Sequence, residues 1–292
     1  MNRLKNLLRN INYLTKHSLW DQREEDIVYL TNKILDDGIY EYSLELDNYK
    51  KLKILNKNES VELILNSGKS FVRFGDGEIH LMQGLDQPFQ KYEIEIARRL
   101  YHILENPRKD LLVALNREYY IPGYIRGNDS FMRRNSYDFR CFLKKYCGDE
   151  TRYIDAACTF GGWGDRSESA YNFWNLWKEA FKDRSIAIVC GKHILDKLEY
   201  DIFELAKSKQ FIYGPKKNAW DEHEKIIEKI KKIDRQTIIV FILGMAGKAM
   251  IPEVADLGYV AWDVGHLAKS YNAFMTNMQV TPENIANFYA PD

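Results

Sequence analysis

The sequence has few cysteines, no net charge and no long apolar run, and each shortage excludes a class of protein. Its four cysteines form no zinc-ligand spacing and require no disulfide framework, so we expect reduced thiols. Lys and Arg number 42, as do Asp and Glu, so no general electrostatic attraction to nucleic acid is expected. The longest apolar run, Thr237–Leu243, is too short to span a bilayer, and no signal-peptide pattern opens the chain. These features favour a cytoplasmic location.

The N-terminal part of the sequence differs from the rest. Residues 1–20 contain basic side chains and no acid, and apolar residues recur at helical spacing from Leu4 to Leu14. The pattern predicts a basic amphipathic helix that packs on the main domain, joins a homodimer, or contacts the inner face of the membrane as a peripheral helix. We place a domain boundary near Asn58, with residues 1–58 as an N-terminal helical extension and residues 59–292 as the catalytic domain.

Beyond this boundary, strand patterns alternate with helix patterns. The predicted strands are Phe71–Phe74, Leu111–Leu115, Tyr153–Cys158, Ile186–Cys190, Gln210–Tyr213, Thr237–Leu243 and Tyr259–Val264. The predicted helices are Ser60–Asn66, Glu78–Gln83, Tyr92–Glu105, Ser167–Phe181, His193–Ser208, Asn218–Lys231 and Lys248–Leu257. Arg117–Arg152 is expected to be a long irregular lid or acceptor platform. The alternation predicts an α/β fold with a mostly parallel sheet and helices on both faces.

The stretch RFGDGE, Arg73 to Glu78, follows one of these strands directly. In open α/β sheets ligands bind beyond the carboxyl ends of the strands, where this stretch is expected to lie. Gly75 and Gly77 permit a close backbone approach. Asp76 and Glu78 are two residues apart and are expected to face the site rather than the core, which suits Mg²⁺ or Mn²⁺ bound with a diphosphate. The alternative is a turn and N-cap, in which Glu78 sits in the first turn of a helix.

Glycines follow several of the predicted strands directly. The pattern of strand, glycine and helix start recurs at Gly75, Gly191, Gly214 and Gly244. Backbone N–H groups at such a helix start can bind phosphate. Neither a GxGxxG string nor a P-loop string is present, so the classical dinucleotide and ATP fingerprints are not supported.

Four separated blocks together resemble one known family. They are RFGDGE (Arg73–Glu78), QKYEIEIARRLYHIL (Gln90–Leu104), GPKKNAWDEHEKI (Gly214–Ile226) and ILGMAGKAMIPEVADLGYVAWDVGH (Ile242–His266). In order and spacing they resemble the GT-D fold glycosyltransferases, bacterial enzymes with a Rossmann-like domain that hold a nucleotide-sugar diphosphate through a metal on a DxE motif. The resemblance extends over roughly Ser60 to Phe274 and is more specific than any single motif.

The resemblance implies a donor site. Asp76 and Glu78 would bind Mn²⁺ or Mg²⁺, and Arg73 would be a phosphate or structural partner. The residues that would contact the nucleotide or its phosphates are Arg73, Gly75, Gly77, Gly191, Gly214, Pro215, Asn218, Ala219, Gly244 and Gly247. The implied donor is a nucleotide-diphosphate sugar, in particular a UDP-sugar such as UDP-glucose.

The acceptor side follows the family pattern less closely. Leu267–Phe274 lacks the acidic residues expected after the DxGH string, and Ile194–Tyr200 replaces an Arg/Gly-rich turn. Asp263 and His266 are the candidate catalytic residues for removing the acceptor proton. The alternative is structural: Asp263 is the N-terminal acid of the helix that follows, and His266 caps that helix.

The resulting hypothesis is a metal-dependent glycosyltransferase whose acceptor is a surface polysaccharide or a glycan on protein. The first alternative is a non-catalytic nucleotide-sugar-binding relative that acts as a scaffold in glycan assembly. An unrelated hydrolase or nucleotidase that uses the same metal pair is a further alternative.

Overall fold

The structure is a computed structural model that describes residue 31 and residues 52–120, 130–279 and 281–289. The chain divides into a larger unit, Lys50–Arg117 with Phe142–Asp292, and a smaller unit, Met1–Tyr49 with Glu118–Cys141. All the predicted site residues belong to the larger unit. The predicted N-terminal helix and its membrane or dimer contact lie outside the described residues, and the domain boundary near Asn58 stays a prediction.

The larger unit is built on a parallel β-sheet. Within the described residues the sheet has eight strands in the order β1-β4-β3-β2-β8-β7-β5-β6. Their bounds are β1 Lys53–Ile54, β2 Ser70–Phe74, β3 Leu111–Leu115, β4 Arg152–Asp155, β5 Ser185–Gly191, β6 Ser208–Gly214, β7 Ile238–Ile242 and β8 Ala261–Asp263. Every neighbouring pair in this order is parallel. The prediction of an α/β fold with a mostly parallel sheet is confirmed.

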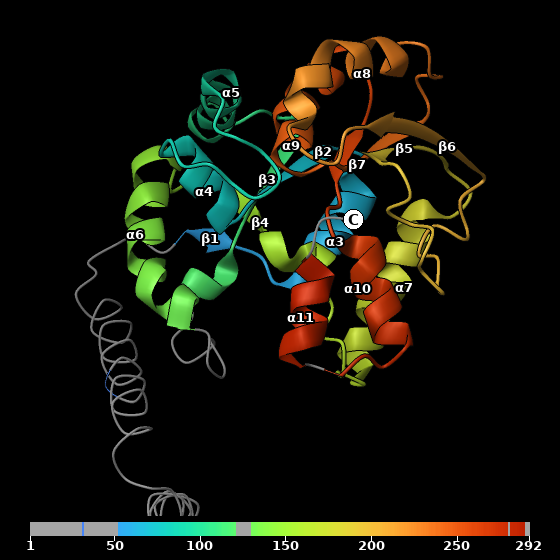
Figure 1. The fold of residues 1–292 in the computed structure, drawn as a ribbon, viewed down its shortest axis with the longest axis horizontal. Coiled ribbons are helices and arrows are strands. Elements are labelled where there is room, and N and C mark those ends of the chain that lie inside the picture. The colour runs from blue at the N-terminus through green and yellow to red at the C-terminus, as the bar shows by residue number, and fades with distance from the viewer. Residues whose placement is uncertain (1–30, 32–51, 121–129, 280, 290–292) are drawn as a thin grey trace, which may run out of the picture. The chain divides into compact units, whose positions relative to one another are not determined.

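Helices cover both faces of the sheet. The helices of the larger unit are α3 Lys57–Ser67, α4 Asp76–Met82, α5 Ile94–Glu105, α7 Glu168–Phe181, α8 His223–Ile230, α9 Gly244–Asp256, α10 Leu267–Met275 and α11 Pro282–Tyr289. Three short 3₁₀ helices are η1 Arg117–Tyr120, η2 Ala156–Thr159 and η3 Ala219–Glu222. Figure 1 shows α5, α8 and α9 on one side of the sheet and α3, α7 and α10 on the other. Among the described residues, no helix is both long and apolar enough to cross a membrane.

A cluster of buried apolar residues lies beneath α3, α7 and α10. Trp262 of the central strand β8 packs against Phe71 of β2, with ring centroids 6.2 Å apart, and against Phe181 of α7, at 5.8 Å. The indole of Trp177, also on α7, donates a hydrogen bond to the Cys158 carbonyl at 2.8 Å, so its buried N–H is satisfied. This packing fixes β2 and β8 side by side, and both strands carry candidate site residues at their carboxyl ends.

The helix predicted over His193–Ser208 is wrong, because this segment forms consecutive turns. Side-chain hydrogen bonds to the backbone replace helical ones: Asn272 Oδ1 accepts from the N–H groups of Glu199 and Tyr200, at 2.8 and 3.0 Å. Asp201 Oδ1 similarly accepts from the Phe203 N–H at 2.8 Å. Such local bonds favour turns over a helix even where apolar residues recur at helical spacing.

Other predicted boundaries also differ from the structure. Arg117–Arg152, expected to be irregular, contains the helix α6, Ser130–Tyr146. The strand predicted over Tyr153–Cys158 ends at Asp155, whose carboxylate accepts from the Ala157 N–H at 2.9 Å and so caps η2. The short strand β1 lies within residues 1–58, which the sequence predicted to be a helical extension. It pairs with β4 at the far edge of the sheet, away from the site residues.

Candidate functional site

An arginine at the end of β2 and an aspartate at the end of β8 form a buried ion pair. Arg73 Nε lies 3.1 Å from Asp263 Oδ2 and Arg73 Nη2 lies 3.1 Å from Oδ1, so the guanidinium binds the carboxylate with two parallel bonds. Thr159 Oγ1 accepts from Arg73 Nη1 at 2.6 Å, and the Arg73 N–H also donates to Asp263. Burial alone would lower the pKa of Arg73, but the Asp263 carboxylate outweighs it and the pKa is raised.

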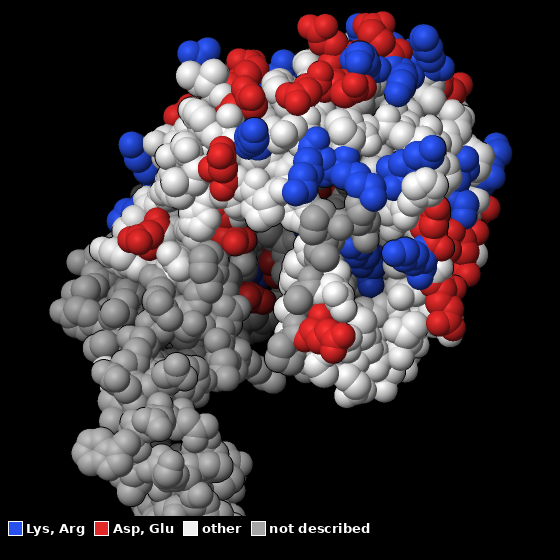
Figure 2. Space-filling model, viewed as in Figure 1, with Lys and Arg blue, Asp and Glu red and all other residues white. Residues whose placement is uncertain are grey.

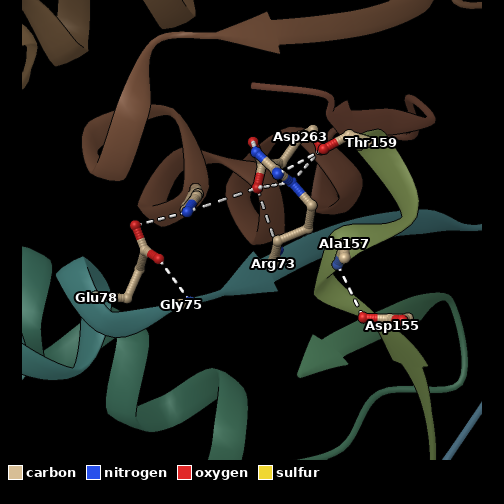
Figure 3. A network of polar contacts seen from close by, with 8 residues as sticks. Arg73, Gly75, Glu78, Asp155, Ala157, Thr159 and Asp263 are labelled. Carbon is tan, nitrogen blue, oxygen red and sulfur yellow. Dashed lines mark hydrogen bonds and ion pairs between the residues drawn. The ribbon is translucent and has the colours of Figure 1, made fainter. Parts of the chain in front are cut away.

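A lysine from α9 extends this pair into a network of four charges, shown in Figure 3. Lys248 Nζ lies 2.5 Å from Glu78 Oε1 and 3.8 Å from Asp263 Oδ2. The side chains of Lys248, Glu78 and Asp263 are only 9%, 7% and 3% exposed. The other oxygen of Glu78 accepts from the Gly75 N–H at 2.8 Å. With Arg73, the network holds two cations and two anions and is therefore neutral.

The two acids of the DxE stretch have different surroundings. Asp76 is exposed, whereas Glu78 is buried, so the expectation that both would face outward is wrong for Glu78. Asp76 and Glu78 lie in the first turn of α4, and the Glu78 carboxylate bonds back to the N-cap residue Gly75. This is the capping arrangement that the sequence offered as the alternative.

The carboxyl of Asp76 is nevertheless perturbed. The Asp76 side chain is exposed to solvent. Neighbouring protein atoms nevertheless surround its carboxyl group, and the resulting desolvation is the largest cause of its raised pKa. The nearby Glu78 carboxylate is the second cause. Among the described residues no group of three or more His, Cys, Asp or Glu side chains could hold a metal ion. Asp76 and Glu78 would therefore have to share a cation with oxygens that a ligand supplies, as Mg²⁺ sites commonly do.

His266 lies just beyond β8, inside an aromatic cluster. Its ring is 5.4 Å from that of Phe288 on α11, 5.8 Å from that of Phe160 and 5.5 Å from that of Tyr289. Burial, followed by the charge of Arg73, lowers the pKa of His266 to about 3. His266 occupies the N-cap position of α10, but its side chain makes no capping hydrogen bond. The imidazole is therefore neutral at pH 7 and weakly basic.

The predicted glycines next to the DxE stretch lie at two helix starts. Gly75 is the N-cap residue of α4 and Gly244 is the first residue of α9, with a φ of 58° that favours glycine. A Cβ at Gly77 would lie 2.8 Å from Met245 Cε, so the Met245 side chain of α9 packs against the first turn of α4. In contrast, a Cβ at Gly247 would lie 3.0 Å from the Phe241 ring, so Gly247 serves the packing of α9 on β7.

Gly191 and Gly214 are register partners at the carboxyl ends of β5 and β6. No helix follows Gly191, so the predicted strand-glycine-helix pattern is wrong there. After Gly214 and Pro215 the 3₁₀ helix η3 leads directly into α8. Asn218, at φ 50°, binds the backbone of a neighbouring loop: its N–H donates to the Phe89 carbonyl at 2.8 Å, and its side chain accepts from the Lys91 N–H at 3.0 Å.

The remaining predicted contact residue, Ala219, is buried and begins η3. Two lysines lie near the carboxyl ends of β5 and β6. Lys192 follows Gly191 directly, and a Cβ at Gly191 would lie 3.4 Å from Lys216 Cγ. Figure 2 shows Lys and Arg side chains gathered on the face where Figure 1 labels β5, β6 and β7. This charge favours an anionic ligand at the carboxyl ends of these strands.

Two residues that organise the site were missed by sequence reasoning. Lys248 is the only charged residue between Leu243 and Pro252, and a lone charge in an apolar helix start indicates a buried partner. Gly265 has a φ of 48°, and a Cβ there would overlap the Arg73 guanidinium. The sequence does not link Arg73 to Gly265, because the two residues are 192 positions apart (265 − 73).

Comparisons with known proteins agree with this architecture. A Streptococcus gordonii protein named probable glycosyl transferase Gly is 25% identical over 257 residues, covering 83% of this chain and 36% of that protein. Glycosyltransferase GlyD of Streptococcus pneumoniae is 25% identical over 257 residues, covering 82% of this chain and 29% of that protein. The chain therefore spans about a third of the length of these curated relatives.

Solved structures match as well. A structure of domain of unknown function 1792, described as having a distinct glycosyltransferase fold, aligns with a TM-score of 0.71 and 26% identity over 82% of this chain and 86% of that chain. A structure described as a new glycosyltransferase from Streptococcus sanguinis aligns with a TM-score of 0.69 and 24% identity, over 82% and 93% of the two chains, and shows similarity of fold. The family model for the glycosyltransferase GT-D fold matches residues 71–286. Because this match covers well over half of the 292 residues, the chain belongs to the GT-D fold glycosyltransferase family.

Proposed function

We propose that this chain transfers a sugar from a nucleotide-diphosphate sugar, such as UDP-glucose, to a hydroxyl of a surface polysaccharide or a protein-linked glycan. The observation that carries the proposal is the exposed Asp76 carboxylate, with a raised pKa, in the first turn of α4, against which the Met245 side chain of α9 packs. Backbone N–H groups at helix starts favour phosphate, and a carboxylate beside them favours a cation shared with it.

Asp76 and Glu78 are the residues that would hold Mn²⁺ or Mg²⁺. Their chemistry suits the ion, since both are carboxylates and the proximity of Glu78 raises the pKa of Asp76, as expected where two anions share one region. Glu78 already pairs with Lys248, so the ion would compete with the ammonium for that oxygen. When bound, a divalent cation would stabilise the negative charge that develops on the leaving diphosphate.

The chain's own residues fix the frame around this site. The Arg73–Asp263 pair joins the ends of β2 and β8, and Lys248 ties both to Glu78. A group held in this way loses little freedom when substrate binds, which is how an enzyme orients reactants before the chemical step. We propose that Arg73 acts through this frame rather than by direct contact with phosphate, because its Nε and Nη2 donate to Asp263 and its Nη1 donates to Thr159.

The structure constrains both residues predicted to remove the acceptor proton. Asp263 already accepts from the Arg73 guanidinium and backbone, and His266, with a pKa of about 3, binds a proton weakly at neutral pH. These two observations favour, as a second candidate function, a nucleotide-sugar-binding relative without turnover. Release of nucleoside diphosphate in the presence of a glycan acceptor would separate the two, since only a transferase releases it.

A thermal-shift panel tests the donor site. Nucleoside diphosphates and nucleotide sugars are added with and without Mn²⁺ to wild type, to Asp76→Ala and to the control Glu62→Ala, which removes an exposed acid on α3. A bound ligand raises the melting temperature by mass action. We expect a Mn²⁺-dependent shift with one nucleotide in wild type and Glu62→Ala, and its loss in Asp76→Ala. No shift with any nucleotide would overturn the proposal.

A further inference from the structure

Strand β6 forms an open edge of the parallel sheet. It is the last strand in the sheet order, and among the described strands it pairs only with β5, from Ser208 to Gly214, as Figure 1 shows at the end of the sheet. Among the described residues, no backbone group outside β5 bonds to Ser208–Ile212. Only at the carboxyl end of the strand does Lys229 Nζ donate to the Tyr213 carbonyl, at 3.3 Å. An open edge of seven residues is a template for another strand.

Two aromatic side chains stand exposed on this edge strand. Phe211 is 44% exposed and Tyr213 is 45% exposed, while Ile212 between them is buried. Their ring centroids lie 5.8 Å apart and their planes are within 14° of parallel, so the two rings form one apolar patch. Natural edge strands usually avoid exposed apolar side chains, because these promote pairing with other strands.

The charges along the strand select the kind of partner. Alternate residues of an extended chain lie on one face, so Lys207, Lys209, Phe211 and Tyr213 form a row with two cations at one end and two rings at the other. Lys207 is exposed and immediately precedes β6, and Lys209 also binds Asp201 Oδ2, at 2.5 Å. The strand itself contains no acid. A parallel copy of this row would place lysines beside lysines, which is unfavourable.

An antiparallel copy places each lysine against a ring. When the two strands cross at Gln210, Lys209 lies opposite Phe211 of the other copy and Lys207 lies opposite Tyr213. A lysine ammonium over the face of an aromatic ring gains a cation–π interaction, its methylene chain gains apolar contact with the ring, and no two like charges face each other. The strand is therefore complementary to itself about a two-fold axis, as an isologous interface requires.

We propose that β6 is a self-association edge, through which a second copy of this chain adds its own β6 in antiparallel register about Gln210. The pairing would join two eight-stranded sheets into one continuous sheet. It would also satisfy the outward-facing backbone groups of Ser208–Ile212. The inference uses only residues of the β6 edge and is independent of the donor chemistry proposed above. Because one strand pair and its four rings bury a small area, the dimer is expected to be weak and concentration-dependent.

The first test is the mass of the full chain in sedimentation velocity over a concentration series. Wild type is expected to shift from the 34.4 kDa monomer towards a dimer as concentration rises. Phe211→Lys places a lysine opposite Lys209 of the other copy and is expected to abolish the shift. Adding Lys209→Glu to Phe211→Lys places opposite charges across the axis and is expected to restore it. The control Leu85→Lys introduces the same charge at an exposed apolar residue far from β6 in sequence.

A cross-linking experiment tests the register. In a Cys141→Ser background, Gln210→Cys places two thiols opposite each other at the two-fold axis, and oxidation is expected to yield a covalent dimer. Ser208→Cys is the matched control, because position 208 faces position 212 of the other copy and not itself. A monomer at every concentration would overturn the proposal. So would a dimer that Phe211→Lys leaves intact, which would place the interface elsewhere, or a cross-link through Ser208→Cys in place of Gln210→Cys.

Discussion

Lys248 Nζ lies 2.5 Å from Glu78 Oε1 and 3.8 Å from Asp263 Oδ2, so a single ammonium joins the acid of the DxE stretch to the acid at the end of β8. All three side chains are nearly excluded from solvent. A buried carboxylate needs a counter-charge, and in this structure Lys248 supplies it for Glu78. A divalent cation at Glu78 would take over part of that role.

The first prediction concerns competition between Lys248 and a divalent cation for the Glu78 carboxylate. Lys248→Met removes the ammonium and leaves the buried Glu78 carboxylate uncompensated, which is expected to lower the free energy of unfolding by about 3 to 5 kcal/mol. Mn²⁺ can then neutralise Glu78, so it is expected to raise the melting temperature of Lys248→Met more than that of wild type. A Mn²⁺ titration followed by thermal unfolding measures both effects without any assay of activity.

Two variants control this experiment. Lys209→Met removes an ion pair with Asp201 at the surface, and its response to Mn²⁺ is expected to match that of wild type. Lys248→Met combined with Glu78→Gln removes both charges, so the extra stabilisation by Mn²⁺ is expected to disappear. Equal Mn²⁺ shifts in wild type and Lys248→Met would show that the ion does not compete with Lys248.

The second prediction concerns the pair between Arg73 and Asp263. Asp263→Asn removes the charge that compensates a buried guanidinium and is expected to cost about 3 to 5 kcal/mol of unfolding free energy. Arg73→Lys keeps the charge but loses the two parallel bonds, and is expected to destabilise as well. Urea unfolding measures both variants.

Arg108→Lys is the matched control, since Arg108 binds Asp110 and Asp256 near the surface. Its expected cost is below about 1 kcal/mol. If Asp263→Asn were as mild as this control, Asp263 would have no structural role, and the remaining interpretation would be its predicted role as a base.

Sequence periodicity predicted most of the sheet because the buried strands are short apolar runs. Ile238–Ile242 and Leu111–Leu115 are fully buried, and each lies within or coincides with its predicted strand. The same periodicity failed at His193–Ser208, where the side chain of Asn272, more than 70 positions away, binds the backbone and favours turns. A contact that depends on a distant residue leaves no local pattern.

The site, like the fold, was predictable only where the local sequence determines it. The residue types and spacing of Asp76 and Glu78 drew attention to the segment that forms the first turn of α4. Their different burial, however, depends on Lys248 of α9. This lysine pairs with Glu78 although it lies 170 positions later in the sequence (248 − 78). Asp263 was assigned a catalytic role because it ends a strand. Its partner Arg73 ends the neighbouring strand, and only the strand order β2-β8 brings the two together.

The third prediction compares two glycines with positive φ. Gly265 and Gly258 have φ values of 48° and 87°, so alanine is strained at both positions. A Cβ at Gly258 meets no atom within 4 Å, whereas a Cβ at Gly265 overlaps the Arg73 guanidinium. Gly265→Ala is therefore expected to destabilise the protein more than Gly258→Ala. It is also expected to weaken any nucleotide-induced thermal shift, because Arg73 must move. Equal losses of stability would show that Arg73 adapts without cost.

The last prediction is a pH dependence of stability that His266 causes. The groups that face it are Arg73, Lys269, Lys248 and Asp263, and burial with the three cations lowers its pKa to about 3 in the folded chain. In the unfolded chain the pKa is about 6.5. Between these values the unfolded chain binds a proton that the folded chain rejects, so the free energy of unfolding falls as pH falls.

Comparison with His266→Gln isolates this effect from the acids that titrate in the same range. The slope for one proton is about 1.4 kcal/mol per pH unit, so wild type is expected to lose about 2 kcal/mol more than the variant between pH 7 and pH 5. Urea unfolding at a series of pH values measures the difference. A constant difference between wild type and His266→Gln across this range would mean that His266 titrates alike in the folded and unfolded chains. The aromatic cluster formed with Phe160 and Phe288 would then have to admit water to the imidazole.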